Sequence, residues 1–175
     1  MSGSGRSEMK QVTIYTDGSA RGNPGPGGFG TVLLYKECKK QISGGFRLTT
    51  NNRMEILAAV VGLYSLRESC RVTLFSDSRY LVDAMTKGWL QNWQRQGWKR
   101  KGDNGRPEPL KNVDLWMRMV EVIEPHHVEW NWVRGHDGNR YNEICDALAT
   151  TAADQRELPP DTFYEASVRQ DALNS

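Results

Sequence analysis

The order of strand-like and helix-like segments constrains the fold of this chain more than any other feature. Three stretches in the first third carry strand-forming residues and predict an antiparallel meander. These stretches are 11–16, 29–35 and 41–48. Two further strand patterns, at 71–76 and 127–133, are separated by helical patterns, which is typical of parallel strands joined by crossovers. The chain therefore predicts an α/β fold with a five-stranded mixed sheet.

Four segments carry the patterns expected of helices that flank this sheet. Asn51 or Asn52 is predicted to cap the first helix, which extends to about Ser69 and is apolar enough to pack centrally on the sheet. The other three helices are predicted at about 78–87, around 113–120, and at 141–153.

Two stretches depart from these patterns. Residues 22–28 are rich in glycine and proline, which regular elements tolerate poorly, so an irregular loop is predicted there. Residues 158–175 are polar and show no clear period, so they are predicted to form a mobile tail. The predicted organisation is a flexible lead at 1–9, one domain at 10–155 and a C-terminal tail at 156–175.

Composition excludes several classes of protein. The length of 175 residues suits one domain with a buried core. Three widely spaced cysteines argue against a disulfide framework or a zinc site and favour the cytoplasm. The start lacks the apolar core of a signal peptide, and no apolar run is long enough for a membrane span. The net charge of +2 is too small to indicate a nucleic-acid partner, so only local clusters of charge can do so.

Two aspartates stand at equivalent places, because Asp17 and Asp77 each follow a predicted strand. Neighbouring strands that end at one edge would bring both side chains into one crevice. Like charges at close range repel, so the pair needs a counter-charge, and oxygen ligands favour magnesium or manganese over zinc. Each acid also has a structural alternative: an Asx turn for Asp17 and a helix cap for Asp77. Glu55 follows Asn52 by three residues, as in a capping box, and Asp146 can simply face water.

Six short strings nevertheless occur in a specific order along the chain. They are Thr16-Asp-Gly-Ser19, Gly22-Asn-Pro-Gly-Pro-Gly-Gly28, Thr49-Thr-Asn-Asn-Arg-Met-Glu55, Ser76-Asp-Ser78, Gly135-His136 and Cys145-Asp146. Any one string is weak evidence, whereas six in order are strong. From about Met9 to Ala153 the series closely resembles ribonuclease H of the bacterial type I family. The family's fold is a five-stranded mixed sheet with helices on both sides and a basic protrusion, in agreement with the predicted order of elements.

The resemblance implies an enzyme that hydrolyses the RNA strand of RNA–DNA hybrids and leaves 5′-phosphate and 3′-hydroxyl ends. It implies four metal-binding carboxylates and a proton-handling histidine, which are Asp17, Glu55, Asp77, Asp146 and His136. Two Mg²⁺ ions about 3.5–4 Å apart are expected, with Mn²⁺ as a substitute. Asp17 would bridge the ions, with Asp77 and Asp146 on the nucleophile side and Glu55 on the other. Without the resemblance, His136 would be interpreted as a loop histidine that has no functional role.

The resemblance also implies contacts with the substrate. Asn23, Thr50, Asn51 and Asn52 match positions that touch the backbone of the hybrid. Segment 88–111 resembles the family's basic protrusion, and its side chains would cradle the DNA strand. Those side chains are Trp89, Trp93, Trp98, Lys99, Arg100 and Lys101.

Two observations bear on the protrusion itself. The segment from Trp89 to Lys111 contains six basic and two acidic residues. Because this positive charge is unbalanced, it indicates a function beyond that of an ordinary solvent-exposed surface. Trp89 and Trp93 have core packing as an alternative, because residues four apart share a helical face. The tip of segment 99–109 is predicted to be a mobile loop.

Two rival functions share these features. One is a nuclease or transferase that uses the same acids on DNA, and the other is a hybrid-binding module that no longer cuts. The intact acid set speaks against the pure binder, which gains nothing from negative charge that faces phosphates. Residues 25–30 match the dinucleotide fingerprint, but a strand follows them instead of a helix. The predicted partner is therefore an RNA–DNA hybrid. The protein is predicted to act as a monomer and not to associate with a membrane.

Overall fold

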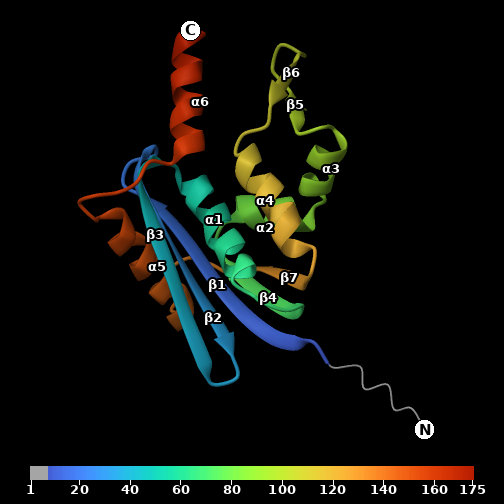
Figure 1. Cartoon of the computed structure of the whole chain (residues 1–175), viewed down its shortest axis with the longest axis vertical. Helices are drawn as coiled ribbons and strands as arrows, with labels where there is room; N and C mark the ends of the chain where they lie inside the picture. The colour runs from blue at the N-terminus through green and yellow to red at the C-terminus, as the bar shows by residue number, and fades with distance from the viewer. Residues whose placement is uncertain (1–7) are drawn as a thin grey trace.

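The computed structural model describes residues 8–175 and contains a five-stranded mixed sheet with strand order β3-β2-β1-β4-β7 (Figure 1). The strands are β1 (Lys10–Ala20), β2 (Gly25–Tyr35), β3 (Cys38–Thr49), β4 (Cys70–Ser76) and β7 (His127–Trp132). β1 pairs antiparallel with β2 and parallel with β4, and β7 continues the parallel part. The predicted meander and crossovers are thus confirmed. Most of the predicted N-terminal lead, residues 1–7, lies outside the described residues.

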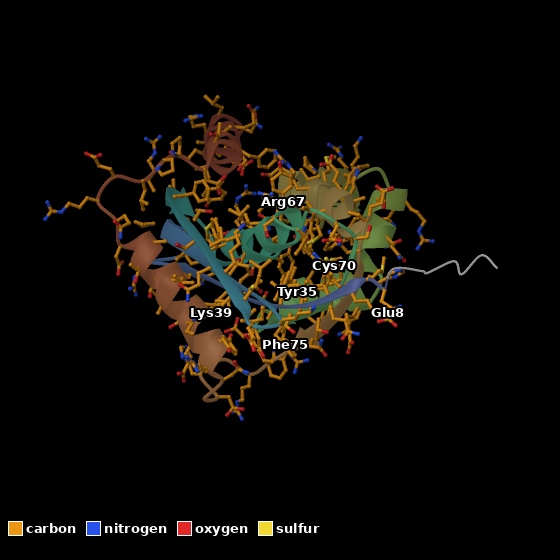
Figure 2. The ribbon with its side chains drawn as sticks, turned by 60° about the horizontal axis from the view of Figure 1, so that its bottom comes forward. Glu8, Tyr35, Lys39, Arg67, Cys70 and Phe75 are labelled. Atoms are coloured by element: carbon orange, nitrogen blue, oxygen red, sulfur yellow. The ribbon has the colours of Figure 1, made fainter. Side chains whose placement is uncertain are left out.

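Helices cover both faces of this sheet (Figures 1 and 2). On one face lie α1 (Asn51–Tyr64), α2 (Arg79–Thr86) and α4 (Val113–Ile123), with α3 (Trp89–Arg95) beside them. On the other lies α5 (Arg140–Ala153). Figure 2 shows Phe75 on the α5 side, where its ring stacks on that of Tyr15 at 4.9 Å between centroids.

The central helix α1 differs from its prediction at both ends. Its N-cap is Thr50, not Asn51 or Asn52, because the Thr50 hydroxyl accepts a hydrogen bond from the backbone N–H of Arg53 at 3.2 Å. The helix ends at Tyr64, five residues before the predicted Ser69, and residues 65–69 form the connection to β4. Its central position on the sheet is as predicted, and nine of its fourteen residues are buried.

The main core lies between the sheet and the helices of the α1 face. Ile14 of β1 and Leu74 of β4 are fully buried, as are Ile56 of α1 and Trp116 and Met119 of α4. Burying a large apolar side chain contributes roughly 1.5–3 kcal/mol relative to leaving it exposed. This packing holds the ends of β1 and β4 in fixed positions.

The glycine-rich stretch is partly a strand. The prediction of an irregular loop up to Gly28 is wrong from Gly25 onward, because β2 begins there. A Cβ on Gly28 would lie 2.3 Å from the Ala149 carbonyl oxygen, and one on Gly30 would lie 2.3 Å from that of Cys145. Both carbonyl groups belong to α5, so the glycines allow this helix to approach the strand closely.

The C-terminal tail is also more regular than predicted. Residues 158–175 contain α6 (Thr162–Leu173), which begins after the N-cap Asp161. The Asp161 carboxylate accepts a hydrogen bond from the backbone N–H of Tyr164 at 3.4 Å. No residue of α6 itself is fully buried, so the helix lacks the broad apolar stripe that would have predicted it.

The chain between α3 and α4 forms a small hairpin. β5 (Lys99–Lys101) pairs antiparallel with β6 (Pro107–Pro109), so the predicted loop has paired flanks and turns at 102–106. This hairpin and α6 project from the same end of the molecule (Figure 1). None of the helices in residues 8–175 combines the length and the apolar composition that a membrane span requires.

Candidate active site

The two aspartates predicted at strand ends lie side by side, although β1 continues past Asp17 to Ala20 and only Asp77 follows the end of its strand. β1 and β4 pair in parallel up to Thr16 and Ser76, so Asp17 and Asp77 follow side by side. Asp17 is 5% exposed, and its Oδ1 accepts a hydrogen bond from the N–H of Gly18 at 2.9 Å. The shared crevice predicted from the strand pattern is therefore present.

Glu55 reaches the same crevice from α1. The helix passes so close to β1 that a Cβ on Gly18 would lie 2.4 Å from the backbone nitrogen of Glu55. Glu55 is 8% exposed, and its Oε2 is buried without a hydrogen-bond partner among the described residues. Because the N-cap is Thr50, Glu55 does not occupy the position that a capping box requires. A buried carboxylate oxygen without a partner is costly, which indicates a missing positive ligand.

The acids form one cluster. Asp17, Glu55 and Asp77 each place one carboxylate oxygen within 4.8 Å of the others. Asp146, from α5, and His136, from the loop before α5, line the same cavity of about 420 Å³. The structure thus brings all five predicted catalytic residues to one place, although only the first three form the tight group.

Burial and mutual repulsion raise the pKa values of two of these acids. The pKa of Asp17 is raised to about 8, first by burial and then by the charge of Asp77, with a further contribution from Asp146. Burial and the charges of Asp17 and Asp77 raise the pKa of Glu55 well above its ordinary value. A nearby cation would favour the ionised forms. All-oxygen donors around an unpartnered buried oxygen fit a hard divalent cation such as Mg²⁺ or Mn²⁺.

A glycine makes room for the histidine loop beside Asp77. A Cβ on Gly135 would lie 2.9 Å from Asp77 Oδ2, so the loop backbone runs directly past this carboxylate. His136 follows with a left-handed φ of 57°, and its side chain is exposed. The loop therefore presents the imidazole at the rim of the cavity, whereas Asp17 and Glu55 lie in its buried part.

The asparagines predicted to contact substrate surround the first turn of α1. The backbone N–H of Asn51 donates to Asn23 Oδ1 at 3.1 Å, and Asn51 Oδ1 accepts from the N–H of Ala20 at 2.7 Å. These bonds use the amide oxygens and leave the NH₂ groups as donors. Asn51 and Asn52 are exposed and line the acid cavity. Thr50 lies beside them as the helix cap.

The tryptophans of the protrusion divide between core and surface. Trp93 is half-buried, and its ring lies 5.3 Å from that of the buried Trp116. Trp89 is 37% exposed and lies 6.2 Å from Trp93. Trp98 is half-buried and has a left-handed φ of 64°. The core-packing alternative therefore describes Trp93, and Trp89 offers the most accessible ring of the three.

The cations of the protrusion are exposed. Lys99, Arg100 and Lys101 lie on β5, and the Arg100 guanidinium pairs with Glu108 of β6 at 3.4 Å. The pairing of β5 with β6 holds these three residues in an extended row. An extended row of exposed cations suits contact with a phosphate backbone.

Two further contacts at the site could not be inferred from the sequence pattern. The indole N–H of Trp132 donates to the backbone carbonyl of Asp77 at 3.0 Å. The Arg79 guanidinium lies over the Trp132 ring, 3.7 Å from its centroid, and Arg79 lines the acid cavity. Trp132 had been predicted only as a strand residue, and its role depends on the pairing of β7 with β4 opposite Ser76. A prediction of that pairing is the one signal that could have revealed the contact.

The chain is similar in sequence to known ribonucleases. The RNase H family matches residues 9–154. Ribonuclease H of Rippkaea orientalis is 54% identical over 156 residues, which cover 89% of this chain and 93% of that protein. Ribonuclease HI of Vibrio parahaemolyticus is 52% identical over 158 residues, which cover 90% of this chain and 99% of that protein.

Solved structures of similar fold agree with these matches. The crystal structure of LC9-RNase H1, described as a type 1 RNase H with the type 2 active-site motif, matches with a TM-score of 0.74 and 34% identity. That match covers 86% of this chain and 75% of the other. LC11-RNase H1, solved in complex with an RNA/DNA hybrid, matches with a TM-score of 0.58 over 82% of this chain and 96% of the other. At 23% identity the second likeness concerns the fold alone.

Proposed function

This chain belongs to the RNase H family, and we propose that its acid cluster hydrolyses the RNA strand of RNA–DNA hybrids, leaving 5′-phosphate and 3′-hydroxyl ends. One observation carries the proposal. Asp17, Glu55 and Asp77 each bring one carboxylate oxygen within 4.8 Å of the others, and Glu55 Oε2 is buried with no partner among the described residues. A module that only binds hybrids has no use for this arrangement, because uncompensated acids repel phosphate.

The carboxylates are proposed to hold two divalent ions, with Mg²⁺ as the ion used and Mn²⁺ as a substitute. Asp17 interacts with each of the other acids and is proposed to bridge the ions. Asp77 and Asp146 would stand on the nucleophile side and Glu55 on the other. Such ions, when bound, lower the pKa of an attacking water and stabilise charge on the leaving oxygen. The support for this assignment is the all-oxygen donor set.

His136 is proposed to handle protons at the rim of the site. Its exposed imidazole lines the acid cavity, so the ring can accept a proton there and release it to solvent. The left-handed backbone of His136 and of the nearby Gly138, with φ values of 57° and 78°, directs the loop past the acids.

Recognition of the hybrid is proposed to rest on shape and on 2′-hydroxyl groups. Asn23, Thr50, Asn51 and Asn52 would contact the backbone of one strand, and the free amide donors support this role. The DNA strand would lie on the protrusion, whose contact residues are Trp89, Trp93, Trp98, Lys99, Arg100 and Lys101. The accessible ring of Trp89 and the exposed cations of β5 support this placement.

The proposal extends to the organisation and location of the protein. We propose a monomer with a catalytic domain at 10–155, a lead at 1–9 and a C-terminal segment at 156–175. The cytoplasm is the proposed location, because Cys38, Cys70 and Cys145 are all free and two of them are buried.

Cleavage assays with matched substrates test the proposed function. The protein is incubated with a labelled RNA–DNA hybrid, single-stranded RNA or double-stranded DNA, each with Mg²⁺ or a chelator. We expect cleavage of the RNA strand of the hybrid, and only with Mg²⁺. Asp77→Asn should lower turnover by about 100-fold or more while it keeps or strengthens hybrid binding, because it removes a metal ligand and reduces repulsion of phosphate.

The matched control is Asp171→Asn, which removes an exposed acid of α6 and should cleave normally. Normal turnover by Asp77→Asn would contradict the proposal. Equal cleavage of double-stranded DNA and hybrid would instead support the rival nuclease.

A further inference from the structure

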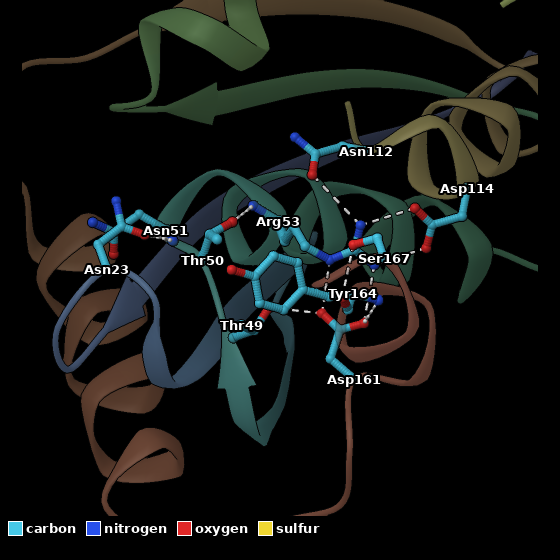
Figure 3. Close-up of polar contacts among 10 residues, drawn as sticks. All are labelled: Asn23, Thr49, Thr50, Asn51, Arg53, Asn112, Asp114, Asp161, Tyr164 and Ser167. Atoms are coloured by element: carbon cyan, nitrogen blue, oxygen red, sulfur yellow. Dashed lines mark hydrogen bonds and ion pairs between the residues drawn. The ribbon is translucent and has the colours of Figure 1, made fainter. Parts of the chain in front are cut away.

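The Arg53 guanidinium is buried between two carboxylates from distant parts of the chain (Figure 3). Its Nε and Nη2 donate to Asp161 at 2.7 and 3.0 Å, and Nη1 and Nη2 donate to Asp114 at 2.8 and 2.7 Å. The side chains of Arg53, Asp161 and Asp114 are 3%, 8% and 27% exposed. One side chain therefore joins α1, the N-cap of α6 and the first turn of α4.

The first turn of α1 is also the turn proposed to contact the hybrid. Figure 3 shows Thr50, Asn51 and Asn23 beside Arg53. The backbone N–H of Arg53 donates to the Thr50 cap, and Glu55 of the acid cluster lies two residues further along the helix. Whatever fixes the Arg53 side chain therefore fixes the turn that carries the exposed asparagines.

Asp114 connects the same network to the basic protrusion. The protrusion ends at Lys111, and Asn112 and Asp114 follow at the start of α4. The Asn112 amide donates to the Tyr80 hydroxyl at 3.4 Å, and Tyr80 lines the acid cavity. The root of the protrusion is thus tied both to the acid cavity and to Arg53.

α6 is attached mainly at its N-terminal end. The Thr49 hydroxyl donates to Asp161 Oδ2 at 2.7 Å, and the Phe163 ring centroid lies 5.5 Å from the Arg53 guanidinium carbon. At the other end Leu173 is 80% exposed. Polar contacts rather than an apolar face attach this helix: the buried carboxylate of Asp161 contacts Arg53 and Thr49, and Glu165 pairs with Arg47.

We infer that Asp161 is a positioning residue for hybrid binding that acts through Arg53. The inference rests on the proposed function. Asp161 and Asp114 hold the guanidinium from two sides and so fix the distance between the first turn of α1 and the root of the protrusion. A hybrid that contacts both surfaces binds more tightly when they are held in place, because the second contact then costs less freedom. Asp161 is outside the acid cavity, so its role concerns binding and leaves the reaction of bound hybrid unchanged.

Asp161→Asn tests the inference with little change of shape. Asparagine still caps a helix, but it lacks the charge that pairs with Arg53. We expect the KM for hybrid to rise about fivefold or more, with kcat in Mg²⁺ within about twofold and a shallower dependence of KM on salt, because fewer cations engage the hybrid. The loss of one negative charge by itself would strengthen binding to a polyanion and lower KM. A rise in KM can therefore not be explained by the change in net charge.

Glu165→Gln is the matched control. It removes the same charge from the same helix and breaks only the pair with Arg47 at 3.0 Å, so its KM should match that of the unaltered protein. Asp114→Asn should raise KM as Asp161→Asn does. The double variant should raise KM by less than the product of the two single increases, because both substitutions act through Arg53.

Circular dichroism establishes that each variant is folded before kinetics are compared. A folded Asp161→Asn with unchanged KM, or with lowered kcat at unchanged KM, would overturn the inference. Should that variant not fold, Thr49→Val removes only one hydrogen bond to Asp161 and should raise KM about twofold at constant kcat, whereas an unchanged KM would overturn the inference. Lack of hybrid cleavage by the unaltered protein and by Glu165→Gln would instead remove the proposed function, so the two failures are distinguishable.

Discussion

Trp132 donates its indole N–H to the backbone carbonyl of Asp77 at 3.0 Å, which joins the end of β7 to a member of the acid cluster. Because the acceptor is a backbone group, the bond fixes the position from which the Asp77 carboxylate projects. The same indole supports the Arg79 guanidinium at 3.7 Å. Trp132 therefore contacts both Asp77 and Arg79.

Trp132→Phe should lower kcat by about threefold to tenfold, the effect of one lost hydrogen bond of about 1 kcal/mol. It should also raise the Mg²⁺ concentration needed for half-maximal activity, because Asp77 is then held less firmly. The measurements are kcat and a Mg²⁺ titration, with the melting temperature as a check of folding. If kcat and the Mg²⁺ requirement both stay unchanged, the bond has no part in placing Asp77.

The metal-free protein should lose stability as pH rises. The pKa of Asp17 is about 8 in the folded protein against an ordinary value of 3.8, and that of Glu55 is also raised. Between these values the folded protein binds more protons than the unfolded chain, so the free energy of unfolding falls with increasing pH. The decrease is complete above the folded pKa values.

Melting in a chelator at about pH 5.5 and about pH 8.5 measures this effect. We expect a decrease of at least a few degrees, a smaller decrease in Asp17→Asn, and a larger Mg²⁺-induced increase at the higher pH. An identical pH dependence in Asp17→Asn and the unaltered protein would show that the acid cluster is not its source.

Neutralising the row of cations on β5 should weaken hybrid binding. We expect Lys99, Arg100 and Lys101, changed together to Gln, to reduce the slope of log affinity against log salt by about 2–3, with little change in kcat at saturation. The control changes Lys36, Lys39 and Lys40 to Gln in and after the turn between β2 and β3, at the opposite end of the molecule (Figure 1). The two variants have the same net charge, so equal salt slopes would show that the β5 row faces away from the hybrid.

Trp89 and Trp93 should respond differently to substitution by alanine. Trp93 packs on Trp116, so Trp93→Ala should lower the free energy of unfolding by about 2–4 kcal/mol. Trp89 is more accessible, so Trp89→Ala should cost about 1 kcal/mol or less in stability but raise the KM for hybrid about fivefold or more. Urea unfolding and steady-state kinetics separate the two effects. A loss of stability in Trp89→Ala as large as that in Trp93→Ala would contradict this division.

The acid cluster was predictable because its signal is local. Asp17 and Asp77 each follow a stretch of strand-forming residues, and parallel pairing of those strands is enough to bring them together. Glu55 and Asp146 could be assigned only through the strings that resemble ribonuclease H. On local pattern alone, a helical acid that enters a cavity looks the same as one that faces water.

The remaining features depend on contacts between distant segments. The strand at Gly25–Gly28 exists because it pairs with β1 and β3, which no local preference for loops reveals. Asp161 and Arg53 are 108 residues apart, and each alone looks like a solvated surface charge. The C-terminal helix was missed for the same reason, since it depends on this buried ion pair and not on an apolar period.

The two glycines under α5 have a consequence for the fourth carboxylate. Asp146 comes directly after Cys145, whose carbonyl oxygen lies against Gly30. Hydrogen atoms in place of side chains thus set the depth at which α5 sits, and with it how far Asp146 reaches into the cavity. Gly28 and Gly30 of β2 therefore determine the distance between the strand and α5. The geometry of the pocket depends on these two positions, although neither is proposed to contact an ion or the nucleic acid.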